Sequence, residues 1–89
     1  MAAVHELSIA LSLVDAVCEE LPKLGAVRVA AVRLRIGAMS GVAPDALEFA
    51  FDVAAGDTPI AGAELAIERS EGRELELIGL EVLDAAADS

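Results

Sequence analysis

Apolar residues recur with two different periods along this chain of 89 residues, and the order of those periods limits the folds open to it. Between Glu6 and Leu24 they return every three or four positions, which predicts a long amphipathic helix. The stretch from Pro44 to about Ala55 has the same period, and proline suits the first turn of a helix. Three other stretches alternate with a period of two and are predicted strands: residues 27–36, 64–69 and 73–83.

The resulting order is helix, strand, helix, strand, strand, which predicts an α/β (α+β) fold. Each predicted strand has one apolar face, so we expect a two-layer sandwich with two helices packed on one face of a three-stranded mixed sheet. The crossover through the second helix makes the first two strands parallel if they are neighbours. Ser70-Glu71-Gly72 is short enough to close a hairpin between the last two strands.

The last predicted strand changes parity partway along. Leu75 and Leu77 fall on one face of a regular strand, whereas Leu80 and Val82 fall on the other. Both pairs can face the helices only if the strand accommodates one extra residue. We therefore predict a β-bulge at Ile78–Gly79.

The length and composition predict a single domain over residues 1–89, with residues 1–4 as an N-terminal extension and residues 84–89 as a frayed tail. A net charge of −10 disfavours binding to nucleic acids or to anionic membranes. The most apolar run is too short to cross a bilayer, and no basic segment of a secretory signal precedes it, so we expect a cytoplasmic protein. One cysteine permits neither an internal disulfide nor a CxxC zinc site.

The single histidine of the chain, His5, stands beside Glu6 just before the first predicted helix. An imidazole, a carboxylate and deprotonated main-chain amides that are adjacent in sequence can chelate one divalent ion. Nitrogen-rich tetragonal coordination favours nickel or copper over magnesium or calcium. The alternative is that both side chains are simply solvated at the start of a helix, and this pattern alone leaves both interpretations open.

Several motifs resemble those of one known family and occur in the same order. They are His5-Glu6-Leu7-Ser8-Ile9-Ala10, Val32-Arg33-Leu34-Arg35-Ile36-Gly37, Ser40-Gly41-Val42, Pro44-Asp45-Ala46-Leu47-Glu48-Phe49-Ala50-Phe51, Gly62-Ala63-Glu64-Leu65 and Gly72-Arg73-Glu74-Leu75-Glu76. Together they cover nearly the whole chain. In these motifs the chain resembles the HypA family of hydrogenase nickel-incorporation proteins.

This resemblance implies a non-enzymatic nickel metallochaperone with no catalytic residues. Such proteins take up Ni²⁺, work with a GTPase partner and pass the ion to the hydrogenase large subunit, or to urease in some bacteria. Family members hold nickel with the histidine and glutamate after the initiator methionine, together with the terminal amine and main-chain amides. These roles fall on His5 and Glu6, with the imidazole as anchor and Glu6 supplying an oxygen or ordering the site.

The chain departs from the family pattern in two places. The family begins Met-His-Glu, whereas Met1-Ala2-Ala3-Val4 precede His5 here, and we hypothesise that Val4 marks the true start and is read as methionine. The family also carries a zinc module with two CxxC pairs between its last two strands. Ser70-Glu71-Gly72 replaces that module, so no Zn²⁺ is expected, and both a natural minimal form and a deliberate deletion remain open.

Two other classes of function were weighed against nickel delivery. A metal-free interaction module would dock the maturation GTPase through its apolar first helix. An enzyme has the least support, because the serines have no fixed base beside them and the loop at residues 37–41 lacks a phosphate-binding fingerprint. Arg33 and Arg35 are expected to pair with glutamates across the open face of the sheet.

Overall fold

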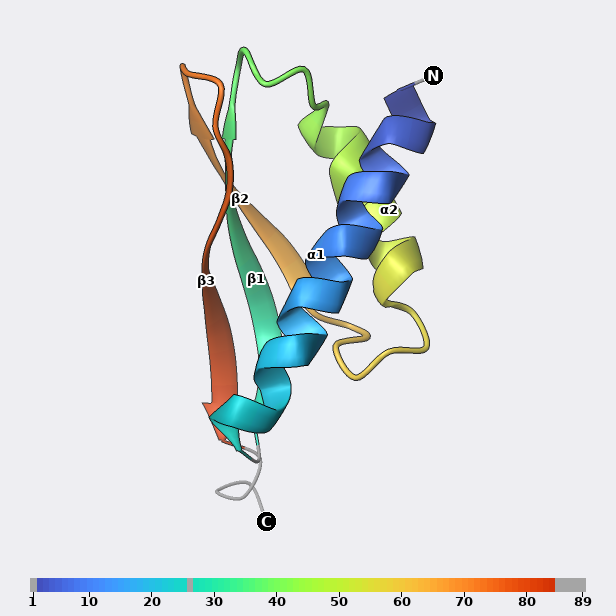
Figure 1. Ribbon diagram of the computed structural model, residues 1–89, viewed down its shortest axis with the longest axis vertical. Coiled ribbons are helices and arrows are strands. Elements are labelled where there is room, and N and C mark those ends of the chain that lie inside the picture. Colours follow the sequence, from blue (N-terminus) through green and yellow to red (C-terminus); the bar gives the residue numbers. More distant parts are fainter. Residues whose placement is uncertain (1, 26, 85–89) are drawn as a thin grey trace.

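A computed structural model describes residues 2–25 and 27–84 of the chain. The elements are α1 (Ala2–Leu24), β1 (Val27–Gly37), α2 (Pro44–Ala55), β2 (Glu64–Ser70) and β3 (Leu75–Asp84). Both helices lie on the same side of a three-stranded mixed sheet (Figure 1). The predicted fold class and order of elements are confirmed.

The boundaries of the two helices follow from their sequences. Helix α1 begins at Ala2 rather than at Glu6, because alanine has the highest helix propensity and carries the helix backward through the preceding residues. It ends at Leu24, and Gly25 takes a left-handed conformation with φ of +80° that glycine adopts without strain. Helix α2 begins at Pro44 and ends at Ala55, as predicted. Neither helix, within the described part of the chain, combines the length and apolarity that a bilayer crossing requires.

The strand order is β2-β1-β3, with β1 parallel to β2 and antiparallel to β3. The predicted hairpin between the last two strands is therefore wrong, since β1 lies between them. Residues 71–74 instead cross the end of β1, where the Gly37 N–H donates to the Glu74 carbonyl at 2.7 Å and the Met39 N–H to the Gly72 carbonyl at 2.8 Å. A Cβ atom at Gly37 would overlap the Gly72 carbonyl, so a glycine here permits the crossing.

The bulge predicted in the last strand is confirmed. Pairing passes from Arg33 opposite Gly79 directly to Leu34 opposite Leu77, which leaves Ile78 as the extra residue of β3. The bulge restores the parity of the strand, because Leu77 and Leu80 both lie opposite residues of β1 that face the helices.

Aliphatic side chains fill the space between the sheet and the helices. Phe51 is completely buried at the centre of this core. The other fully buried large apolar side chains are Val17 of α1, Val32 and Leu34 of β1, Leu47 of α2 and Ile60 of the following loop. The core thus joins both helices to the central strand.

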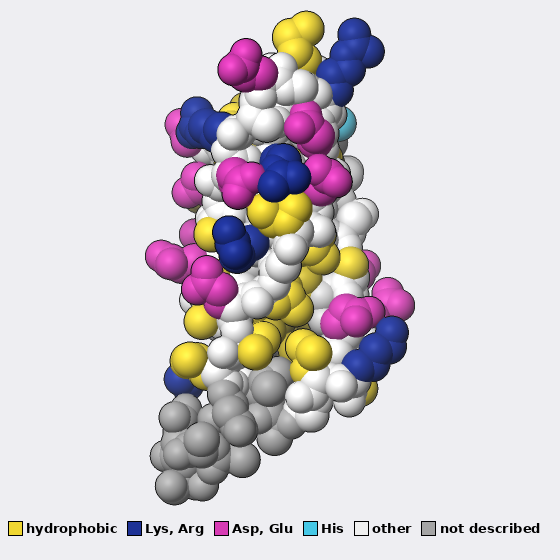
Figure 2. All heavy atoms as spheres, turned by 90° about the vertical axis from the view of Figure 1, so that its left-hand side faces the viewer, with side chains coloured by type: hydrophobic (Ala, Val, Ile, Leu, Met, Phe, Trp, Pro, Cys, Tyr) yellow, Lys and Arg dark blue, Asp and Glu magenta, His cyan; other side chains and the backbone are white. Residues whose placement is uncertain are grey.

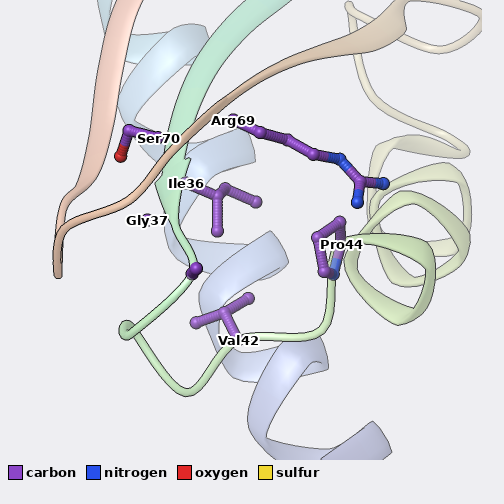
Figure 3. A pocket seen from close by; sticks show the side chains of 7 residues that line it. Ile36, Gly37, Val42, Pro44, Arg69 and Ser70 are labelled. Carbon is purple, nitrogen blue, oxygen red and sulfur yellow. The ribbon is translucent and has the colours of Figure 1, made fainter.

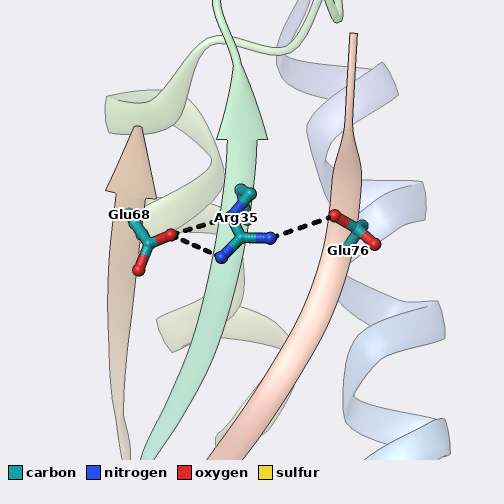
Figure 4. A network of polar contacts seen from close by, with 3 residues as sticks. All are labelled: Arg35, Glu68 and Glu76. Atoms are coloured by element: carbon teal, nitrogen blue, oxygen red, sulfur yellow. Dashed lines mark hydrogen bonds and ion pairs between the residues drawn. The ribbon is translucent and has the colours of Figure 1, made fainter. Parts of the chain in front are cut away.

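The open face of the sheet carries a charged network centred on Arg35 (Figure 4). Its Nε donates to Glu68 Oε1 on β2 at 2.7 Å, and one terminal nitrogen lies 3.5 Å from Glu76 Oε1 on β3. The hydrogen bond to Glu68 is the main reason why the pKa of Arg35 is raised further above its ordinary value. Pairing with facing glutamates is therefore confirmed for Arg35, whereas no such pair involves Arg33 among the described residues.

Candidate metal site at the start of helix α1

His5 and Glu6 are neighbours in the chain, but their side chains point in different directions. They are the fourth and fifth residues of α1. Consecutive residues of an α-helix are rotated by about 100° around its axis. The His5 side chain is exposed to solvent, whereas Glu6 retains only 1% of its accessible surface. The two predicted ligands therefore lie on the surface and in the interior, respectively.

The carboxyl group of Glu6 links α1 to the start of α2. Its Oε2 atom accepts a hydrogen bond of 2.9 Å from the main-chain N–H of Ala43, the residue just before α2. Ala43 has no polar side chain with which to cap α2. Glu6, 37 positions earlier in the chain, instead holds the main chain at the start of α2. The Oε1 atom is buried without a hydrogen-bond partner among the described residues.

The burial of Glu6 has a signal in the sequence that the motif-based interpretation passed over. Glu6 precedes Ala10, Val14 and Val17 at spacings of four, four and three residues, so it belongs to the buried stripe of α1. Residues at these spacings share one face of a helix. A carboxyl group at that position needs an internal hydrogen-bond donor, and the Ala43 N–H supplies one.

The site as folded offers one accessible ligand group, the His5 imidazole. Within the described residues, no three histidine, cysteine or acidic side chains converge to hold a metal ion. Chelation by main-chain amides competes with α1 itself, since amides beyond the first turn already donate to helical carbonyls. The positive end of the helix dipole also opposes a cation at this point. A tetragonal chelate at His5 thus requires the opening turn of α1 to unwind.

A cavity of about 160 Å³ lies near the same end of the molecule but does not include either residue. It is lined by the end of β1, by Val42 and Pro44, and by the end of β2 (Figure 3). The Arg69 side chain extends across it toward Pro44, whereas Ser70 points away. A guanidinium group does not coordinate metal ions, so Arg69 adds no metal ligand to this cavity.

Fold and site together define a small two-layer α+β domain with one exposed imidazole on its first helix and a buried carboxyl group that joins its two helices. Residues 4–75 match the family model described as "Hydrogenase/urease nickel incorporation, metallochaperone, hypA". The chain belongs to this HypA family, which confirms the resemblance found in the sequence.

Curated relatives carry the name "Hydrogenase maturation factor HypA". The protein from Chloroflexus aurantiacus is 53% identical over 64 residues, which cover 72% of this chain and 56% of the relative. The protein from Roseiflexus sp. is 55% identical over 64 residues, covering 72% and 52%. The protein from Deinococcus radiodurans is 48% identical over 68 residues, covering 76% and 57%. The chain therefore spans little more than half the length of these relatives.

Proposed function

We propose that this chain is a non-enzymatic nickel-binding accessory protein that delivers Ni²⁺ during maturation of [NiFe] hydrogenase in the cytoplasm. Membership of the HypA family supports a role in hydrogenase maturation. The exposed imidazole of His5 is the observation that supports a nickel-binding site on α1. The nickel-delivering GTPase of the pathway and the hydrogenase large subunit are the proposed partners. Urease remains an alternative client, since the family description names it.

In this proposal His5 binds the ion and Glu6 orders the site. The imidazole nitrogen is free to coordinate, and main-chain nitrogens released from the opening turn complete a tetragonal set that suits Ni²⁺. The carboxyl group of Glu6 is already engaged with the Ala43 N–H inside the protein. We therefore assign Glu6 to anchoring the second turn of α1 while the first turn rearranges around the ion.

The rearrangement costs little, because the end of a helix is its least stable part. The main-chain N–H groups of the first turn lack helical partners, so opening it breaks only the hydrogen bonds that its carbonyl groups accept. Because the ligands must lose protons on binding, acid releases the metal. This gives the protein a simple means of holding nickel reversibly.

A metal-free docking module is the second candidate function. Exposed apolar side chains on both helices, among them Leu7 and Phe49, favour it. Such a module would bind the GTPase equally well with or without His5, which separates it from nickel delivery.

Calorimetric titration with Ni²⁺ tests the nickel proposal. We expect the full chain to bind one ion, His5→Ala to lose that binding, and Glu19→Gln, which alters an exposed acid elsewhere on α1, to retain it. A chain that begins at residue 4 as methionine should bind more tightly, because its terminal amine then lies beside His5. Equal heats for the full chain and His5→Ala would contradict the proposal.

A further inference from the structure

Among the described residues, five large apolar side chains of α1 and α2 are exposed: Leu24 at the end of α1, and two pairs nearer the start of the helices. Phe49 and Val53 of α2 retain 73% and 60% of their accessible surface, and Leu7 and Leu11 of α1 are also exposed. Each pair is spaced by four residues and so forms one ridge along its helix. We call these four residues the helical apolar face.

The helical apolar face contains a groove rather than a flat surface. Leu7, Phe49 and Val53 line a hollow of about 220 Å³ whose floor is formed by Ala46 and Ala50 of α2. The two alanines lower the floor between larger neighbours. Both helices begin near the same end of the molecule and cross at an angle (Figure 1), and Leu11 follows Leu7 by one turn of α1, outside the lining of the hollow. Its shape suits an elongated apolar ridge, such as one face of a helix.

The charges around the groove are almost all negative. Asp45 precedes Phe49 by one turn, and Asp15 follows Leu11 by one turn. Glu48 and Asp52 lie on the β2 side of the α2 ridge, where they line a second hollow with Glu64. The two helices contain a single lysine or arginine, Lys23, which lies at the far end of α1 and is bonded to Glu20 at 3.2 Å. On the side that carries the sheet, by contrast, basic and acidic side chains are interspersed (Figure 2).

This charge pattern selects among the possible occupants of the groove. A second copy of the chain would place one acidic margin against another, and like charges across an interface repel. Anionic lipid and nucleic acid are repelled for the same reason. A protein segment with an apolar ridge between basic margins fits both the groove and its rim.

We propose that the helical apolar face docks an amphipathic, basic helix of a partner protein. Leucine-like side chains of that helix occupy the groove between α1 and α2, and its lysine or arginine side chains meet Asp15, Glu48 and Asp52. His5 lies on a different part of α1, about 160° around the helix from Leu7, so docking leaves the imidazole accessible. The face is thus a partner site separate from the nickel ligands.

Three synthetic helical peptides of equal length test the proposal by fluorescence anisotropy. In the first, leucines recur every three or four residues on one face of the helix and lysines occupy the opposite face; the second replaces lysine with glutamate, and the third replaces leucine with serine. We expect the full chain to bind only the leucine–lysine peptide with appreciable affinity. If the serine–lysine peptide binds equally well, charge alone explains the interaction and the proposal is overturned. The proposal is also overturned if neither lysine-containing peptide binds.

Point variants locate the binding. Phe49→Ala and Leu11→Ala should each weaken binding of the leucine–lysine peptide about tenfold, since each removes a large apolar contact. The double variant Glu48→Gln, Asp52→Asn should weaken it and reduce its salt dependence. Met39→Ala is the matched control, because Met39 is 65% exposed but lies in the loop after β1. Equal losses in Met39→Ala and Phe49→Ala would overturn the assignment of the face. His5→Ala should bind the peptide normally, so this result is independent of nickel binding.

Discussion

Glu6 shows how one side chain can change role between a sequence motif and a folded protein. Next to the only histidine, it reads as a metal ligand. In the structure it is nearly completely buried and holds the Ala43 N–H at the corner before α2. Its carboxyl group therefore contributes to the position of both helices.

This role predicts different effects for two substitutions of Glu6. Glu6→Ala removes a buried side chain and the acceptor of the Ala43 N–H, which should lower the free energy of unfolding by about 1–3 kcal/mol. Glu6→Gln keeps an acceptor oxygen at the same position and should lose less. Urea denaturation measures both, with Glu19→Ala as an exposed control that should stay within about 0.5 kcal/mol of the parent chain. Equal losses for Glu6→Ala and Glu6→Gln would exclude the hydrogen bond as the reason.

The lowered pKa of Glu74 predicts that the stability of the fold depends on pH. The pKa of its carboxyl group is lowered from the ordinary value of 4.5, chiefly by its own main-chain N–H. Because the pKa is lower in the folded chain than in the unfolded chain, the carboxylate stabilises the fold above the ordinary value. That stabilisation is lost as the pH falls through the folded pKa.

The corresponding measurement compares the parent chain with Glu74→Gln in urea at a series of pH values. We expect the parent chain to lose more stability than the variant as the pH falls from about 6 to about 3. Parallel stability profiles over that range would show that Glu74 contributes nothing to the acid response.

At the scale of the elements, the crossing of residues 71–74 over the end of β1 depends on Gly37. A methyl group there would displace the main chain at Gly72, so Gly37→Ala should destabilise the fold by about 1–3 kcal/mol, as overpacking does. Gly79→Ala is the matched control in β3, since a Cβ atom at Gly79 meets nothing within 4 Å. Thermal unfolding of the two variants measures the difference. Similar melting temperatures for both would mean that the crossing tolerates a side chain.

The sequence predicted the type and position of every element because apolar periodicity is a local property. It also predicted the bulge of β3, since the parity of Leu75, Leu77, Leu80 and Val82 can be read along one strand. The strand order could not be read in this way. A connection as short as residues 71–74 is compatible with a hairpin, and only the contact with Gly37 reveals that the chain crosses β1 instead.

For the candidate site, the sequence shows which residues are neighbours but not where their side chains point. His5 is accessible, as a ligand must be, whereas the inward direction of Glu6 depends on the rotation of α1 against the core. That rotation is encoded by Ala10, Val14 and Val17, which share the face of Glu6. Family motifs identify residues that occur together, but they do not say which of them coordinates and which supports.

At the scale of the whole molecule, the helix layer and the sheet differ in charge. The helices are acidic and carry the exposed imidazole and the helical apolar face, whereas the sheet carries the Arg35 network. The helix layer thus carries both proposed binding sites, one for a metal ion and one for a protein partner. Because the core packs both helices against the sheet, the positions of these two sites relative to each other are fixed.

The central claim is that His5 coordinates nickel, and X-ray absorption of the nickel-loaded chain tests it most directly. The claim predicts a nitrogen-rich coordination sphere with the outer-shell scattering of an imidazole, and loss of that scattering in His5→Ala. A coordination sphere of oxygen atoms alone, identical in the parent chain and in His5→Ala, would contradict it.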